Sequence, residues 1–488
     1  MKKNDMTSAP RDTQWREELR KSKTAKERTS IPRVKMPELD PAYRVTCNEE
    51  VNQGISAEQA VLEATRCMDC PDPQCVTGCP VGINIPGFIK NIERGDFHSA
   101  AVVLKETSAL PAVCGRVCPQ EKQCESRCVY HKMKKQPVAI GYLERFAADN
   151  ERLSGEKVTP SVAPANGKKV AVVGSGPAGL SFAGDMIKRG YEVTVYEALH
   201  EIGGVLKYGI PEFRLPNSVV DEEINVLSAL GVKFVKDCVI GKTLSYDDLM
   251  ALNYDGLFVA SGAGLPRFMN IPGENLIGVM SSNEYLTRVN LMGAGRDGSD
   301  TPVLKGKRVA VIGGGNTAMD SVRTARRMGA EVAMIVYRRG ETEMPARAEE
   351  VKHAKEEGVL FMNLCNPVEY RGDEKGRVNM MLVQRMELGE PDESGRRSPV
   401  PIEGAIDEIP VDLVIVSVGV SPNPLIPNSV DGLEVSRRGT IVVNEDTMQS
   451  SLAPLYAGGD IVRGGATVIL AMGDGRRAAA AMDSALCG

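Results

Sequence analysis

The stretch KVAVVGSGPAG, residues 169–179, decides the fold of this chain. Its apolar half predicts a buried strand, and the glycines that follow predict a tight turn into a helix. Gly174 permits the turn, Gly176 lets the backbone approach a pyrophosphate, and Gly179 lets the helix pack on the strand. A second strand ends about 20 residues later in a carboxylate that can accept ribose hydroxyls. We therefore predict a dinucleotide-binding βαβ unit rather than a structural turn. Its binding residues are Gly174, Ser175, Gly176, Pro177, Ala178, Gly179 and Glu197.

The same unit is repeated at KRVAVIGGGNTA, residues 307–318. Here Ala318 replaces the third glycine, and the corresponding strand end carries Arg338 and Arg339 instead of an acid. A carboxylate would repel a ribose 2′-phosphate, whereas guanidinium groups pair with it. The second unit therefore predicts NADPH rather than NADH, although two arginines could also form a plain solvated strand end. The candidate residues are Gly313, Gly315, Asn316, Thr317, Ala318, Arg338, Arg339 and, further on, Arg347.

Most cysteines of the chain are clustered, since nine of the 12 fall between Cys47 and Cys128. They form two groups of related spacing, CxxCxxxxCxxxCP (67–80) and CxxxCPxxxxCxxxC (114–128). A cysteine followed directly by proline is typical of ferredoxin-like runs that hold two interleaved iron–sulfur clusters. A disulfide scaffold would need an oxidising compartment, which nothing in the sequence indicates. Zinc is the remaining alternative, but the neighbouring dinucleotide unit favours iron–sulfur.

Composition excludes several classes of protein. At 488 residues the chain predicts more than one domain, and a net charge of -5 gives no basic excess for nucleic acid. No apolar run reaches the roughly 18 to 20 residues that span a bilayer, and the first residues lack the apolar segment of a signal peptide. We expect a cytoplasmic protein. None of the four histidines lies in a motif, so we expect no catalytic side chain.

Together these motifs resemble a known family. The two cysteine groups, GGVLKYGIPEFRLP (203–216), GGGNTAMD (313–320) and AGGD (457–460) closely resemble the small subunits of bacterial NADPH-dependent glutamate synthases. A wider family includes the iron–sulfur half of dihydropyrimidine dehydrogenase and the large subunit of NADH-dependent ferredoxin:NADP oxidoreductases. The resemblance implies an α/β protein with a helical N-terminal cluster domain and two Rossmann-like domains, arranged as in glutathione reductase with the NADPH domain inserted in the FAD domain.

The resemblance also implies domain limits. An extension (1–36), either loose or docked, precedes the double-cluster domain (37–160). The FAD domain would take residues 161–290 and 426–488, and the NADPH domain residues 291–425. The cofactors would be FAD, NADPH and two 4Fe-4S clusters. Flavin contacts would come from Gly203, Gly204, Gly459, Asp460 and Thr467.

The cluster ligands carried over from the family divide the cysteines between the two groups. One cluster would take Cys67, Cys70, Cys75 and Cys128. The other would take Cys79, Cys118, Cys124 and a non-cysteine ligand, for which Glu144 in the stretch IGYLE (140–144) is the candidate. Cys114 is then a structural thiol, although spacing alone would also allow it as the eighth ligand.

The function implied is electron transfer. A hydride from NADPH would reach FAD, and single electrons would pass through the two clusters to a large glutamate synthase subunit that makes L-glutamate from glutamine and 2-oxoglutarate. The chain alone is not expected to hydrolyse glutamine, because no cysteine precedes Cys47. One alternative is the large subunit of an electron-bifurcating ferredoxin:NADP oxidoreductase, with another redox protein as partner. A second is a zinc-stabilised scaffold with a vestigial nucleotide fold.

Overall fold

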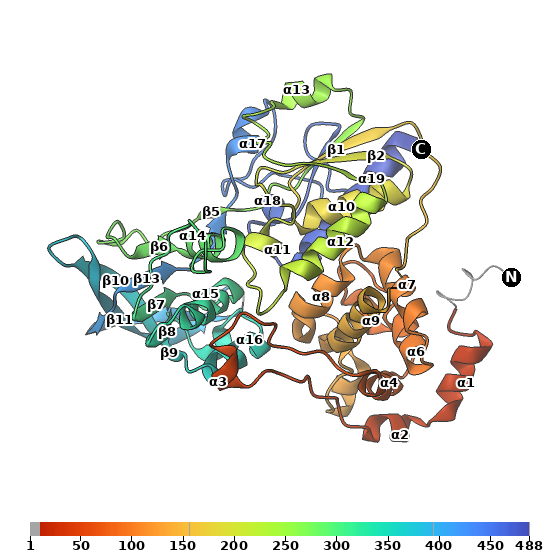
Figure 1. Cartoon of the computed structure of the whole chain (residues 1–488), viewed down its shortest axis with the longest axis horizontal. Coiled ribbons are helices and arrows are strands. Elements are labelled where there is room, and N and C mark those ends of the chain that lie inside the picture. Colours follow the sequence, from red (N-terminus) through yellow and green to blue (C-terminus); the bar gives the residue numbers. More distant parts are fainter. Residues whose placement is uncertain (1–9, 156, 394, 488) are drawn as a thin grey trace.

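The computed structural model describes residues 10–155, 157–393 and 395–487. Three regions can be followed in Figure 1: orange helices at the lower right, a yellow and blue α/β layer at the top, and a green and cyan α/β layer at the left. This arrangement confirms the predicted fold class. No helix in the described ranges is both long enough and apolar enough to cross a membrane.

The upper layer contains a five-stranded parallel sheet in the order β15-β4-β1-β2-β3. Its last strand, β15 (Leu455–Ala457), comes from the C-terminal part of the chain and pairs with β4 (Gly256–Val259). Two central helices, α10 (Pro177–Lys188) and α19 (Val468–Cys487), pack against each other beside the sheet. This domain is therefore built from two separated segments. Its other elements are β1 (Lys169–Val173), β2 (Glu192–Tyr196), α11 (Val205–Tyr208), α12 (Asn217–Ala229), β3 (Lys233–Val235), α13 (Tyr246–Ala251), α17 (Leu425–Ser429) and α18 (Asp460–Arg463).

The second sheet is also parallel and follows the order β6-β13-β7-β8-β9. The chain enters this domain after β5 (Leu265–Pro266) and leaves it at β14 (Val420–Ser421), and these two short strands pair with each other. The inserted arrangement predicted for the NADPH domain is thereby confirmed, but its sheet already includes β6, which precedes the predicted boundary at residue 291. Its elements are β6 (Val279–Ser281), α14 (Ser282–Leu286), η5 (Thr287–Leu291), β7 (Arg308–Ile312), α15 (Asn316–Arg327), β8 (Val332–Tyr337), η6 (Glu341–Glu343), α16 (Ala348–Glu356), β9 (Leu360–Asn363) and β13 (Leu413–Val416).

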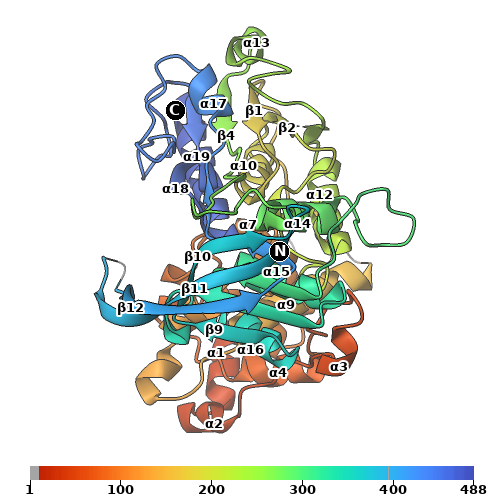
Figure 2. The ribbon, with the colours of Figure 1, turned by 90° about the vertical axis from the view of Figure 1, so that its left-hand side faces the viewer.

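An antiparallel sheet that the sequence analysis did not single out extends from this domain. It consists of β10 (Cys365–Gly372), β11 (Val378–Pro391) and β12 (Arg397–Pro410), in that order. Figure 2 shows β11 and β12 reaching out beyond the body of the molecule. The outer strand β12 carries Pro399 and Pro401, which cannot donate backbone hydrogen bonds and so discourage further strands from pairing with this edge.

The cluster domain is helical. Its α helices are α4 (Ala57–Thr65), α5 (Gln74–Thr77), α6 (Ile85–Glu93), α7 (Phe97–Thr107), α8 (Pro111–Val117) and α9 (Ile140–Ser154). Two short turns, η2 (Gln120–Lys122) and η3 (Glu125–Arg127), lie between cysteines of the second group, and a third, η4 (Val129–Met133), follows Cys128 on the way to α9. The cysteines therefore lie mainly on short turns, where closely spaced thiols can point toward a common centre.

The N-terminal extension is docked from residue 10 onward. Its helices are α1 (Gln14–Ser22) and α2 (Ala25–Ser30). Arg16 on α1 is buried and forms an ion pair with Asp69, which lies between two cysteines of the first group. Arg28 on α2 is buried against Glu93 at 2.8 Å. The described residues of the extension are therefore docked rather than loose.

The domains share their apolar cores unequally. One continuous core joins the cluster domain to the FAD domain, and it includes Leu110 just before α8, Phe182 on α10 and Met472 on α19. The NADPH domain packs around separate cores on the two faces of its own sheet. It reaches the rest of the chain through polar contacts, such as the ion pairs between Arg44 on α3 (Pro41–Arg44) and Glu357 after α16. Figure 1 shows α3 lying against α16.

Candidate cofactor sites

The first glycine loop has the geometry that its sequence predicts. Gly174 has φ +100°, and a Cβ there would lie 2.5 Å from the carbonyl oxygen of Ala260. A Cβ on Gly179 would lie 2.0 Å from the Gly174 carbonyl oxygen. By contrast, a Cβ on Gly176 would meet nothing within 4 Å. Two glycines thus allow close backbone packing, while the third leaves an open cradle at the N-terminus of α10, where a phosphate is favoured.

Glu197 is held beside this loop. Its Oε2 accepts hydrogen bonds from the backbone N of Ser175 at 2.9 Å and from the Ser175 hydroxyl at 2.6 Å. Its Oε1 accepts from the backbone N of Leu199 at 2.9 Å. The backbone N of Gly203 donates to the same Ser175 hydroxyl at 2.9 Å, and a Cβ on Gly204 would lie 3.0 Å from the Gly176 Cα. The first glycine loop, residues 203–204 and Glu197 therefore lie together.

The C-terminal part of the chain reaches the same place. Asp460 accepts a hydrogen bond from the backbone N of Ala466 at 2.8 Å, and burial raises its pKa to about 6. The backbone N of Gly459 donates to buried Asp474 at 3.0 Å. Burial, together with the carboxylates of Asp460 and Glu197, raises the pKa of Tyr208 to about 12. Tyr208 thus lies near both carboxylates, although the sequence analysis quoted its stretch without selecting it.

Thr467 stands at the start of α19 and contacts the cluster domain. Its hydroxyl accepts from the side-chain amide of Gln123 at 3.5 Å, and Gln123 directly precedes Cys124. The hydroxyl also accepts from the backbone N of Leu470 at 3.4 Å. The helix start that the family resemblance assigns to the flavin is therefore next to a predicted cluster ligand.

The second glycine loop repeats the first. Gly313 has φ +137°, and a Cβ there would lie 2.3 Å from the Ser417 carbonyl oxygen. Gly315 has open space, since the nearest atom to its Cβ position is 4.0 Å away. Asn316, Thr317 and Ala318 form the first turn of α15, with Ala318 fully buried. The loop can therefore accept a second pyrophosphate at a helix N-terminus.

The three candidate arginines of this domain do not converge. Arg338 is exposed and has no hydrogen bond or ion pair within the described part of the chain. Arg339 is buried and forms an ion pair with Asp392 at 2.5 Å. Arg347 is buried and donates to the Arg116 carbonyl oxygen at 2.7 Å. Only Arg338 is thus free at the strand end, and Arg347 is directed at the cluster domain instead.

The first set of predicted cluster ligands comes together. Burial raises the pKa of the Cys75 thiol, and the neighbouring thiols of Cys67, Cys128 and Cys70 raise it further. All four thiols are half-buried, and none forms a disulfide. Thiols from two distant stretches of sequence therefore share one small volume.

The second set surrounds a buried carboxylate. Burial raises the pKa of Glu144 to about 8, and its Oε1 has no hydrogen-bond partner in the described residues. Burial and Glu144 raise the pKa of Cys79 to about 11. Burial, Glu125 and Glu144 raise the pKa of Cys124, and the hydrogen bond that the Cys118 thiol donates to Cys114, burial and Glu144 raise that of Cys118. A buried, unpartnered carboxylate among thiols is costly unless a cation binds it, so these residues fit a cluster site.

Cys114 also lies at this site. It is fully buried next to Cys118, and its Sγ lies 3.4 Å from the Met472 Sδ. The geometry thus places both Glu144 and Cys114 near the second set, and Glu144 remains our predicted ligand.

One helix links the flavin loop to the cluster site. A Cβ on Gly475 of α19 would lie 2.4 Å from the Ala178 carbonyl oxygen in the first glycine loop. A Cβ on Gly473 would lie 2.9 Å from the carbonyl oxygen of Pro80, the residue after Cys79. Glycines at these positions let α19 approach both backbones directly. The two cofactor sites are therefore separated by little more than one helix.

Comparison with known proteins identifies the two parts. A model described as dihydropyrimidine dehydrogenase domain II, 4Fe-4S cluster, matches residues 44–156, and one described as pyridine nucleotide-disulphide oxidoreductase matches residues 168–482. FprA from Mycobacterium tuberculosis in complex with NADPH has a TM-score of 0.55 at 22% identity, over 67% of this chain and 85% of FprA. That likeness supports the fold of the two nucleotide domains.

Curated relatives are similar over nearly the whole chain. The glutamate synthase (NADPH) small chain of Halomonas elongata is 37% identical over 450 residues, covering 91% of this chain and 94% of its own length. The Escherichia coli small chain is 35% identical, with coverages of 92% and 96%. The beta subunit of a Moorella thermoacetica NADP-dependent formate dehydrogenase is 38% identical, with coverages of 84% and 60%. The chain therefore belongs to the glutamate synthase (NADPH) small-chain family, which joins a 4Fe-4S domain to a pyridine nucleotide-disulphide oxidoreductase domain.

Proposed function

We propose that this chain takes electrons from NADPH, passes them through FAD and two 4Fe-4S clusters, and delivers them to a large glutamate synthase subunit. The observation that carries the proposal is α19, which touches the flavin loop at Ala178 and the cluster loop at Pro80. Hydride and electron transfer both require short distances between cofactors, and a single helix in close backbone contact with both loops supplies a short path.

The chain's own residues would position the flavin. The open cradle at Gly176 would receive the pyrophosphate, and Glu197 would accept the ribose hydroxyls. Asp460 would contact the ribityl chain, and Thr467 would lie near the ring. When bound, FAD supplies the conversion between a two-electron hydride and single electrons. Gly315 would receive the NADPH pyrophosphate, and Arg338 would pair with the 2′-phosphate.

The burial of the two ligand sets supports an order of transfer. Cys118, Cys124 and Glu144 of the second set are buried and Cys79 is half-buried, whereas all four thiols of the first set are half-buried. We therefore propose that electrons reach the Cys79 set first and leave the chain from the Cys67 set. Exposed Lys132 and Lys134 lie shortly after Cys128 on the outer side, so an acidic partner surface would dock there favourably.

The identity of the partner subunit is proposed from the relatives of this chain. Small chains of glutamate synthase act with a large subunit, and their similarity to this chain supports the same partner here. A formate dehydrogenase beta subunit of comparable identity shows that related chains serve other enzymes. We propose a cytoplasmic location, because clustered reduced thiols suit a reducing compartment.

The proposal is tested by anaerobic reconstitution. The purified chain is expected to contain FAD, iron and sulfide, and NADPH should bleach its flavin spectrum. Addition of the large subunit should then give glutamate from glutamine and 2-oxoglutarate only when this chain and NADPH are both present. A colourless, zinc-containing protein would contradict the electron-transfer function. Flavin reduction without glutamate formation, together with NADPH-dependent ferredoxin reduction, would instead favour the bifurcating alternative.

A further inference from the structure

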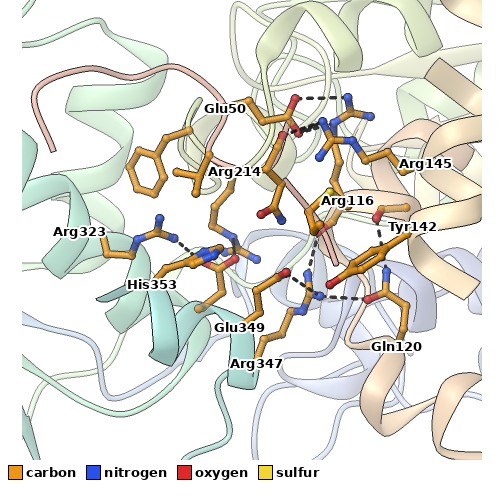
Figure 3. Close-up of a pocket in the computed structure, with 16 residues that line it drawn as sticks. Glu50, Arg116, Gln120, Tyr142, Arg145, Arg214, Arg323, Arg347, Glu349 and His353 are labelled. Carbon is orange, nitrogen blue, oxygen red and sulfur yellow. Dashed lines mark hydrogen bonds and ion pairs between the residues drawn. The ribbon is translucent and has the colours of Figure 1, made fainter. Parts of the chain in front are cut away.

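A small cavity lies where the cluster, FAD and NADPH domains meet (Figure 3). Its volume is about 20 Å³, far below the several hundred Å³ of a typical small-molecule site. Carboxylates such as Glu50 and Glu350 offset its positive charge. The cavity is therefore a joint between domains rather than a binding site. Its five arginines are Arg116, Arg145, Arg214, Arg323 and Arg347.

Arg347 differs from the other four because it carries a charge from the NADPH domain into the cluster domain. Its Nη1 donates to the Arg116 carbonyl oxygen at 2.7 Å, and its Nη2 donates to the Gln120 Oε1 at 3.0 Å. Figure 3 shows the side chain reaching toward Gln120 and Tyr142. Only 5% of Arg347 is exposed, so solvent screens its charge weakly, and the charge is partly offset by Glu349 at 3.2 Å and Glu121 at 3.8 Å.

The residues that Arg347 contacts flank a predicted cluster ligand. Arg116 and Gln120 stand two positions before and after Cys118. The Gln120 amide in turn donates to the Cys114 carbonyl oxygen at 3.3 Å. Arg347 therefore contacts both residues that flank Cys118, which places its guanidinium beside the loop of that ligand.

The other end of the same residue contacts the second glycine loop. The backbone N of Arg347 donates to the Asn316 Oδ1 at 2.9 Å, and Asn316 is the first residue of α15. Asn316 directly follows Gly315, where the pyrophosphate cradle opens. One residue thus connects the NADPH loop to the loop of a cluster ligand.

We propose that Arg347 is a positioning residue that docks the NADPH domain on the Cys118 loop and raises the reduction potential of the cluster at that loop. The inference rests on the ligand assignment proposed above. Gaining an electron makes a thiolate-bound cluster more negative, so a buried guanidinium nearby favours the reduced form. Removing the guanidinium should therefore lower the potential of this cluster and leave the more distant one unchanged.

The test is a redox titration of the reconstituted holoenzyme, followed by electron paramagnetic resonance. Arg347→Gln should shift the reduced-to-oxidised ratio of one cluster at least tenfold at a fixed potential, which is about 59 mV for one electron. Glu144→Ala should perturb the same signal. Arg347→Lys keeps the charge and should shift the ratio less. The control Arg308→Gln removes an exposed charge from the same domain and should change neither potential.

A second variant keeps the inference testable if Arg347→Gln does not load cofactors. Gln120→Glu adds a negative charge at the Arg347 contact and should lower the same potential. If every cofactor-loaded variant has two clusters with wild-type potentials, the role of Arg347 is wrong but the ligand assignment stands. A wild-type chain without two clusters would overturn the ligand assignment as well.

Discussion

The cluster domain meets its two neighbours through surfaces of opposite character. Toward the FAD domain it shares one apolar core, in which Leu110, Phe182 and Met472 are fully buried. Toward the NADPH domain the described contacts are mainly polar, with Arg44 paired to Glu357 at 2.9 Å and Arg347 donating to the Arg116 carbonyl oxygen at 2.7 Å. Apolar cores hold domains rigidly, whereas polar interfaces allow relative motion. The flavin-to-cluster distance is therefore fixed, while the NADPH domain can move to exchange its nucleotide.

The largest effect is expected from breaking the apolar junction. In Gly475→Val the new side chain would meet the Ala178 carbonyl oxygen, with Cβ at 2.4 Å, and neither backbone can retreat. The variant should lose more than about 3 kcal/mol of unfolding free energy, beyond the usual cost of overpacking. FAD and clusters should be lost together, as measured by flavin and iron content.

The exposed position Ala480 on the same helix provides the matched control. Ala480→Val should cost well under about 1 kcal/mol, since it changes only helix propensity. Normal cofactor content in Gly475→Val would mean that α19 does not hold the two sites together.

The ion pairs around Glu357 should weaken at low pH, and the loss of stability should stay local to the NADPH domain. Burial alone would raise the pKa of Glu357, but ion pairs with Arg323 and Arg327 lower it to about 2. Its folded pKa lies below the ordinary value of 4.5, so its stabilisation is present above pH 4.5 and lost as the pH falls toward 2. Hydrogen exchange in α16 should accelerate over that range, while exchange in α10 and α19 should lag behind.

Substituting this carboxylate sharpens the same test. Glu357→Gln removes a counter-charge that Arg44, Arg323 and Arg327 share and should cost about 3 kcal/mol, confined to the NADPH domain. The neighbouring Glu356→Gln, at an exposed position, should cost under about 1 kcal/mol. Equal exchange rates in the two variants would contradict a junction held by Glu357.

A smaller effect is expected on nucleotide choice within the NADPH domain. Arg338→Glu should weaken NADPH binding by roughly 100-fold, about 2.7 kcal/mol, because the charge-assisted contact to the 2′-phosphate becomes repulsive. NADH binding, measured by the same flavin-bleaching titration, should change little. Arg308→Glu is the control for general charge effects. Equal losses for both nucleotides would remove Arg338 from phosphate recognition.

The smallest expected change concerns the eighth ligand. Glu144→Ala should perturb one of two cluster signals and leave FAD content unchanged, because the carboxylate faces only the second thiol set. The matched substitution Cys114→Ala should leave both signals in place. The reverse result would make Cys114 the ligand.

Periodicity and glycine spacing were enough to predict both βαβ units, because strand, turn and helix are local. Side-chain direction was not predictable: Arg347 follows the arginine pair closely in sequence, yet its guanidinium turns to Gln120 of another domain. Glu144 was reached only through family resemblance, since no spacing rule selects a carboxylate among cysteines. The β10-β11-β12 sheet was missed because its strands lack a nucleotide motif.

The central claim is that electrons from NADPH leave the flavin through two separate clusters, and Cys75→Ser tests it most directly. Anaerobic addition of NADPH should bleach the flavin of this variant as in the wild type. After dithionite, the wild type should show two cluster signals by electron paramagnetic resonance and the variant only one. Loss of FAD in the variant, or two unchanged cluster signals, would contradict the account.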